Sequence, residues 1–112
     1  PVQCEYLALE GLGQLTNTLE LVRRNLNPRL KLRGLLLTMF DVRTNLSQQV
    51  ADEVRSHFAN TFKTVIPRSV RLSEAPSHGL PIARYDPSSR ANRAYEELAE
   101  ELIAGSRTEV PA

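Results

Sequence analysis

The sequence contains little of what defines several narrow classes of protein. Its 112 residues include one cysteine, no tryptophan and only 5% aromatic residues. A lone cysteine forms no internal disulfide, which excludes a disulfide-stapled secreted domain and predicts that Cys4 is a small buried hydrophobe. No apolar run approaches the roughly 20 residues of a transmembrane helix. These absences predict one soluble globular domain kept in a reducing compartment.

The sequence also has no large excess of positive or negative charge. Lys and Arg number 14 against 13 Asp and Glu, a net charge of +1, whereas a dedicated nucleic-acid module is strongly basic overall. The charges are unevenly distributed, because basic residues run through the middle of the chain and glutamates crowd one late segment. A local basic face is therefore possible around Arg33, Arg43, Lys63, Arg68, Arg71, Arg84, Arg90 and Arg93.

Motifs of self-contained catalysis are absent too. There is no Gly-x-x-x-x-Gly-Lys loop to cradle phosphates and no Gly-x-Gly-x-x-Gly. His57 and His78 lie far apart and outside metal-ligand spacing with a cysteine, so no metal site is expected. Ser47, Ser73 and Ser77 lack a nucleophile-elbow context. The chain alone is predicted to hold no catalytic residue.

Apolar periodicity predicts three long helices. The first spans about residues 8–26, with an apolar residue every three or four positions, and ends at Asn27-Pro28. A coiled coil has the same spacing, but only about three heptads precede the proline. The second helix is predicted to begin at Asn45, capped with Gln48 three residues later. The third is predicted to be capped by Ser88 or Ser89 and to end at Gly105.

Two short apolar runs and one stub are predicted to be strands. Residues 30–37 form a leucine-rich run typical of a strand buried on both faces, and residues 62–66 form another that ends at Pro67. Pro1-Val2-Gln3 is interpreted as the end of a further strand. The proline-punctuated residues 67–87 are predicted to be a long structured loop with one helical turn.

This order of elements predicts the fold class. Strands that alternate with helices favour right-handed crossovers and a parallel sheet, so we expect an α/β fold of about three strands with flanking helices. So few strands leave an apolar sheet edge open, and the sheet is therefore expected to be incomplete and marginally stable alone. Residues 1–104 are assigned to this part of a domain and residues 105–112 to a flexible tail.

Three strand ends join helices or loops with distinctive sequences. In a parallel sheet they lie at the same edge, the carboxyl edge, where ligands bind. The stretches are residues 3–12 (QCEYLALEGL), 36–47 (LLTMFDVRTNLS), and 64–82 (TVIPRSVRLSEAPSHGLPI) followed by 85–89 (YDPSS). From residue 1 to about residue 102 they resemble, in the same order, the carboxyl-terminal half of the ParA/Soj chromosome- and plasmid-partitioning ATPases, relatives of MinD with a P-loop-NTPase-like fold.

The resemblance implies a function for the intact protein. It would bind ATP with Mg²⁺, form a homodimer with nucleotide at the interface, and bind DNA non-specifically as that dimer. A ParB-type partner would stimulate hydrolysis, and the location would be cytoplasmic and nucleoid-associated, without a membrane. The family's Walker A loop, magnesium-binding switch and Walker B-like strand have no counterpart in this sequence, so the chain alone is expected to bind no nucleotide tightly and to be inactive.

The resemblance also implies which residues would lie beside the adenine. They are Thr38 and Met39 at a strand end and Pro67, Arg68 and Ser69 in the following loop. Met39 is polarizable and suits a flat ring, although methionine also serves as ordinary core filler. Ser69 stands where the family commonly has Asn, so no side-chain role is assigned to it.

Two arginines match the family's DNA contacts, Arg43 before the second helix and Arg71 in the long loop. Such residues can meet phosphates without reading bases, which suits sequence-independent binding. Arg68 and Lys63 would widen that patch. The alternative is that each arginine is a solvated charge or pairs with Asp41, Asp52 or Glu74.

Two other functions stay open. The chain can be an interaction module that completes its sheet with another subunit and regulates it. It can also belong elsewhere in the wider MinD and cobyrinate-synthase-like superfamily, or be an oxidoreductase of the same architecture. These last would share the architecture but lack the long loop and the Arg43 and Arg71 matches.

Overall fold

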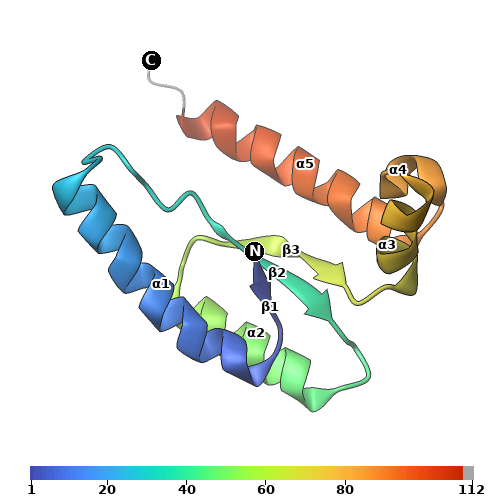
Figure 1. Ribbon diagram of the computed structural model, residues 1–112, viewed down its shortest axis with the longest axis horizontal. Coiled ribbons are helices and arrows are strands. Elements are labelled where there is room, and N and C mark those ends of the chain that lie inside the picture. The colour runs from blue at the N-terminus through green and yellow to red at the C-terminus, as the bar shows by residue number, and fades with distance from the viewer. Residues whose placement is uncertain (110–112) are drawn as a thin grey trace.

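A three-stranded parallel sheet lies between helices in the computed structural model, which describes residues 1–109, the last three by backbone alone (Figure 1). The strands are β1 (Val2–Gln3), β2 (Leu35–Phe40) and β3 (Thr61–Pro67), in the spatial order β1-β2-β3. Both pairings are parallel, with Val2 opposite Leu37 and Leu37 opposite Val65. The predicted α/β class with a small parallel sheet is confirmed.

Helices cover the two faces of this sheet unequally. α1 (Tyr6–Asn25) joins β1 to β2 and α2 (Asn45–His57) joins β2 to β3. The two helices pack together on one face, as two consecutive crossovers of the same hand require, whereas α5 (Arg90–Glu109) packs on β3 across the other face (Figure 1). The predicted helices are thus all present.

The main core lies between the sheet and the α1–α2 face. Leu37 and Val54 are almost wholly buried there, and Cys4 is 2% exposed, which confirms its prediction as a small buried hydrophobe. Burial is the main cause that raises the pKa of the Cys4 thiol, opposed by the charge of Arg55. The core residues are Val2, Cys4, Leu35, Leu37, Val50, Ala51 and Val54.

The segment before β2 differs from its prediction. The strand begins at Leu35, not at residue 30, because the preceding carbonyls are bonded by side chains instead of a neighbouring strand. Arg23 Nε donates to the Leu30 carbonyl at 2.9 Å and Asn60 Nδ2 to the Leu32 carbonyl at 3.1 Å. Burial on both faces is also wrong in part, since Leu35 and Leu37 are buried but Leu36 is only half-buried.

The helix caps correct one prediction and confirm another. Thr44, not Asn45, caps α2, because the Thr44 hydroxyl accepts from the Ser47 backbone N–H at 3.3 Å. Ser89, one of the two predicted caps of α5, accepts from the Asn92 backbone N–H at 3.1 Å.

α5 does not end at Gly105 but continues to Glu109. Arg33 Nη2 donates to the Leu102 carbonyl at 3.4 Å and contacts the Ser106 hydroxyl, which ties the last turns to the segment before β2. The predicted tail after Gly105 is thus helical as far as it is described. Residues 110–112 lie outside the described residues.

Residues 67–87 form more structure than the predicted loop with one turn. They contain α3 (Val70–Glu74), the 3₁₀ helix η1 (Ala75–His78) and α4 (Ile82–Tyr85) at the carboxyl end of the strands. The prolines explain the error, because they start helical turns here: Pro76 lies in the first turn of η1 and Pro81 precedes α4. Gly79, at φ 67°, ends η1 in the left-handed region.

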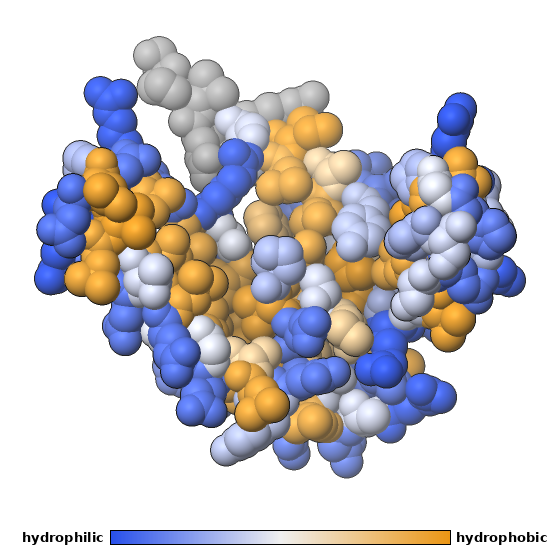
Figure 2. All heavy atoms as spheres, in the orientation of Figure 1, coloured by the Kyte–Doolittle hydropathy of each residue, from blue (hydrophilic) through white to orange (hydrophobic). Residues whose placement is uncertain are grey.

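α1 packs against the core through Ala8, Leu9 and Leu12 but is less deeply buried than α2 and α5. No residue of α1 is fully buried, and Leu15, on its apolar stripe, is 52% exposed. Figure 2 shows apolar side chains open to view on the face between the arms formed by α1 and α5. The radius of gyration is 15.8 Å, against about 13 Å for a compact domain of 100 residues. The fold is therefore open and consistent with part of a P-loop-NTPase-like domain.

Candidate functional site

The carboxyl ends of the three strands meet at one edge, as predicted for a parallel sheet. The Cys4 backbone N–H donates to the Thr38 carbonyl at 2.9 Å, and the Arg68 N–H donates to the Phe40 carbonyl at 2.9 Å. These bonds continue the strand pairing into the loops and hold the three strand ends side by side. The distinctive stretches after the strands therefore share a single surface.

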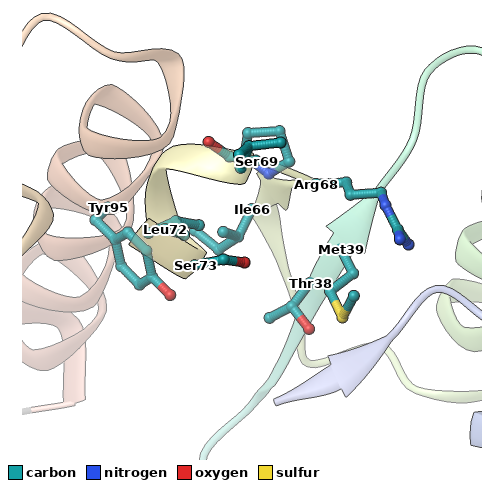
Figure 3. Close-up of a pocket in the computed structure, with 10 residues that line it drawn as sticks. Thr38, Met39, Ile66, Arg68, Ser69, Leu72, Ser73 and Tyr95 are labelled. Carbon is teal, nitrogen blue, oxygen red and sulfur yellow. The ribbon is translucent and has the colours of Figure 1, made fainter. Parts of the chain in front are cut away.

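A hollow of about 410 Å³ opens at this edge (Figure 3). Thr38 and Met39 line it from the end of β2, and Pro67, Arg68 and Ser69 line it from the end of β3 and the start of α3. The structure thus brings all five residues of the predicted adenine site around one cavity. Its volume lies within the range of small-molecule pockets, roughly 300–1,000 Å³.

Five other lining residues were missed by the sequence analysis, and two of them, Ile66 and Val70, directly flank the predicted loop residues. Leu72 and Ser73 come from α3, and Tyr95 comes from α5 on the far side of the hollow (Figure 3). Tyr95 is 39% exposed, although its spacing places it on the apolar stripe of its helix. The sequence carried one signal for Tyr95: a tyrosine on an apolar stripe. Tyrosine favours positions where its ring meets apolar atoms and its hydroxyl meets water.

Met39 has a strained backbone. Its φ is 53°, the only positive φ of a non-glycine residue among those described. It lies where the β2–β3 register shifts between Leu37 and Phe40. A left-handed residue at a bulge costs about 1–2 kcal/mol and re-aims the side chain, and Met39 is one of the residues that line the hollow. Such strain is concentrated at functional sites, so it is a reason to look for a function at Met39.

Arg68 and Ser69 contribute differently from Met39. The Arg68 guanidinium points away from the hollow (Figure 3) and lies 3.8 Å from the Glu5 carboxylate. Ser69 is the residue before α3, but its hydroxyl makes no capping bond. Thr38 directs its hydroxyl to the Val2 carbonyl at 3.5 Å. The loop after β3 therefore lines the hollow without directing a charge into it.

A second hollow of about 410 Å³ adjoins the first and shares Pro67, Arg68, Ser69 and Val70 with it. Arg43 and Arg71, the two arginines predicted to contact DNA, both line this second hollow, and Arg90 joins them. The structure therefore brings the predicted pair together, next to the predicted adenine site.

Ion pairs shape the electrostatics of the second hollow. A side-chain hydrogen bond from Arg43 is the main cause that lowers the pKa of Asp41. Around Arg71, a hydrogen bond with Tyr85 and the charges of Glu74 and Asp86 raise the arginine's pKa. The Tyr85 hydroxyl donates to Glu74, which raises the pKa of the phenol. Both arginines are thus charged and matched by carboxylates, as the alternative interpretation of these residues foresaw.

Metal ligands do not gather at this edge. Among the side chains that the structure describes, those of residues 1–106, no three from His, Cys, Asp or Glu lie close enough to hold a metal ion. His78 instead stacks on Tyr85 with ring centroids 4.9 Å apart.

These features define a class of protein: an α/β fold with a small parallel sheet whose carboxyl strand ends line two adjoining hollows. The family follows from sequence comparison. Residues 5–82 match the model of the CobQ/CobB/MinD/ParA nucleotide binding domain. The chain belongs to this family.

Within the family, the chain is similar to chromosome-partitioning proteins. It is 60% identical to the sporulation initiation inhibitor protein Soj of Bacillus subtilis and 57% identical to the chromosome-partitioning ATPase Soj of Thermus thermophilus, each over 93% of this chain. Identity to the chromosome partitioning protein ParA of Myxococcus xanthus is 54% over 92% of this chain. The chain spans 37–42% of the length of these relatives. The resemblance to the ParA/Soj proteins is thereby confirmed.

None of the helices within residues 1–109 is both long enough and apolar enough to cross a bilayer.

Proposed function

We propose that this chain supplies the adenine side of an ATP site and part of a DNA-binding surface in a ParA-type partition ATPase. The observation that carries the proposal is the hollow at the carboxyl edge, which unites Thr38, Met39, Pro67, Arg68 and Ser69 in a chain up to 60% identical to partition proteins. As in other open parallel sheets, a ligand at this edge meets residues from several strand ends.

The chemistry of the hollow suits an adenine. Met39, Leu72 and Tyr95 provide apolar and aromatic surface for the faces of the ring, and the loop after β3 provides backbone groups for its polar edge. The sequence holds no Gly-rich loop with a lysine for the phosphates and Mg²⁺. The proposal therefore assigns this chain the base, and assigns the phosphates and hydrolysis to the full-length protein.

A titration with a fluorescent ATP analogue tests the adenine site in the full-length gene product. Met39→Ala and Tyr95→Ala remove ring contacts, so each is expected to raise the Kd by about three- to tenfold. The control is Leu26→Ala, which truncates an apolar side chain that is 80% exposed at the far end of α1. Unchanged affinity in both site variants would refute this location for the base.

DNA binding is assigned to Arg43 and Arg71. Guanidinium groups on one exposed surface bind phosphates without reading bases, and the affinity then falls steeply with salt. Removing each arginine is expected to weaken binding to duplexes of unrelated sequence equally and to reduce the slope of log K against log salt by about 0.9. Arg24→Ala on α1, whose side chain is 71% exposed, is the matched control.

The remaining steps of the proposal concern assembly. The full-length protein would form an ATP-dependent homodimer, bind the nucleoid in the cytoplasm and hydrolyse ATP faster when a ParB-type partner is added. Sedimentation with and without ATP tests the dimer, and an ATPase assay with the partner encoded beside it tests the stimulation. A protein that is monomeric with ATP and indifferent to that partner would contradict both.

The open edge of β1 supports a second candidate, an interaction module that completes its sheet with another subunit. An open groove runs beside β1, lined by residues that include Leu7, Ala8, Leu12 and Leu15, and Leu7 is 74% exposed. The purified 112-residue chain would then form a discrete oligomer or complex without ATP. A heterogeneous, dye-binding sample would exclude this function.

A further inference from the structure

Arg43 is held by a carboxylate of its own loop. Its Nε and Nη2 donate to the two Asp41 carboxylate oxygens at 3.0 and 3.1 Å. Asp41 Oδ1 also accepts the Arg43 backbone N–H at 3.0 Å, which fixes the turn. The Arg43 side chain remains 82% exposed, whereas that of Asp41 is 18% exposed. The Arg43 guanidinium is therefore open to solvent while two of its nitrogens already bind the Asp41 carboxylate.

Arg71 is held by two carboxylates from different segments. Its Nε lies 3.3 Å from Asp86 Oδ2, after α4, and its Nη1 lies 3.6 Å from Glu74 Oε2 at the end of α3. Other side chains hold these partners in place, since the Ser88 hydroxyl donates to Asp86 at 3.2 Å and the Tyr85 hydroxyl donates to Glu74. The Arg71 side chain is still 56% exposed.

Most of the arginines that line the second hollow are paired in the same way. Its lining holds four arginines, and three of them pair with carboxylates, Arg68 with Glu5 at 3.8 Å among them. Asp41 is the one carboxylate in the lining itself, and Glu5, Glu74 and Asp86 pair with the arginines from outside it. A phosphate approaching it must compete with carboxylates that already occupy the guanidinium groups. The pairs are Arg43 with Asp41, Arg68 with Glu5, and Arg71 with both Glu74 and Asp86.

We propose that Asp41 and Asp86 attenuate DNA binding, because each competes with phosphate for one arginine, Asp41 for Arg43 and Asp86 for Arg71. The inference rests on the proposed DNA function of those arginines and adds its regulation. A surface built this way binds phosphates weakly, releases them readily and is sensitive to salt. Asp41 and Asp86 are positioning residues that act through the arginines and touch no DNA themselves.

The test uses the full-length protein with ATP and a fluorescent duplex of arbitrary sequence. Asp41→Asn and Asp86→Asn remove the charge but keep the side-chain shape and an acceptor oxygen for the Arg43 N–H or the Ser88 hydroxyl. Each is expected to tighten binding by about two- to fivefold, the effect of an exposed ion pair. Asp52→Asn makes the same change of charge on the exposed face of α2, beside Gln48, and is expected to change the Kd by much less.

A double-mutant cycle separates competition from a general effect of charge. In an Arg71→Ala background, Asp86→Asn is expected to leave the Kd unchanged, and in an Arg43→Ala background the same holds for Asp41→Asn. Tightening that persists without the arginine overturns the proposal, as does an aspartate variant that binds DNA no tighter. Thermal unfolding of each variant confirms that it is folded, and the two aspartates provide independent tests.

Failure of the DNA function itself gives a different result. If Arg43→Ala and Arg71→Ala bind the duplex as tightly as the unaltered protein, the arginines are not DNA contacts and the attenuation proposal falls with them. If the arginine variants lose affinity but the aspartate variants do not gain it, the DNA function stands and the attenuation alone is refuted.

Discussion

The carboxylate of Glu101 in α5 binds the outer edge of β3 at Thr64. Glu101 Oε2 accepts the Thr64 backbone N–H at 3.0 Å and its hydroxyl at 2.8 Å, and Oε1 accepts the Lys63 N–H at 2.7 Å. β3 is the last strand on this side of the sheet in the described chain. Burial acts to raise the pKa of Glu101, but these hydrogen bonds outweigh it and the pKa lies below its usual value.

Replacing Glu101 by Gln is expected to lower the free energy of unfolding by about 1–2 kcal/mol at neutral pH, because an amide oxygen accepts these bonds less strongly than a carboxylate. Since the folded pKa is lowered, the carboxylate stabilises the fold above its unfolded pKa of about 4.3. This stabilisation is lost as the pH falls through the folded pKa. The variant and the parent should therefore converge in acid, as measured by urea unfolding at several pH values.

The neighbour Glu100 provides the control for that measurement, since it is exposed on the same helix. Glu100→Gln should change stability by less than about 0.5 kcal/mol. If Glu100→Gln and Glu101→Gln lowered the free energy of unfolding equally, the effect would come from the charge of the helix and not from the bonds to β3.

The left-handed backbone of Met39 predicts an inverted order of stability for two small replacements. Glycine is normally less stable than alanine in a strand by about 0.5–1 kcal/mol, but at φ 53° alanine bears the left-handed penalty and glycine does not. We expect Met39→Gly to unfold at higher denaturant than Met39→Ala. At Thr38, whose φ is not positive, the alanine variant should be more stable than the glycine variant. An alanine variant that is also the more stable one at Met39 would contradict the strain.

The cap of α2 gives a prediction that separates two adjacent residues. Thr44→Ala removes the hydroxyl that accepts from the Ser47 N–H and should destabilise the protein by about 1 kcal/mol. Asn45→Ala, at the first helical position, should be close to neutral. Denaturant unfolding of both variants measures the difference, and a larger loss at Asn45 would restore it as the cap.

Cys4 should react slowly with a thiol reagent in the native protein. It is 2% exposed, and its raised pKa keeps the thiolate scarce at pH 8. The neutral thiol stabilises the fold below its unfolded pKa of about 8.5, and this contribution is lost as the pH rises through the folded value. Labelling should accelerate in parallel with unfolding as urea is added. Native labelling as fast as that of a Glu5→Cys, Cys4→Ala variant would show an open site.

The sequence predicted elements well where the signal was local. α1, α2 and α5 follow from apolar periodicity, and the parallel sheet follows from their alternation with strands. The start of β2 did not follow, because Leu30 and Leu32 have the composition of a strand. Their carbonyls are bonded by Arg23 and Asn60, which no local pattern reveals.

The site was predictable only in part for the same reason. The resemblance indicated five residues that do line one hollow, but all lie close to two strand ends. Tyr95 reaches it from α5, and its spacing matched a core stripe equally well. The positive φ of Met39 could not be predicted from the sequence, because glycine and asparagine are the residues that commonly adopt that conformation.

The contact between Glu101 and β3 makes the two edges of the sheet differ in their ability to pair with a further strand. The outer N–H groups of Lys63 and Thr64 are occupied by a side chain, whereas β1 pairs on one side only within residues 1–109. An extended segment, from this polypeptide or another molecule, can thus be added beside β1 but meets a blocked ladder at β3. Assembly and misassembly of this sheet are therefore both expected to proceed from the same end.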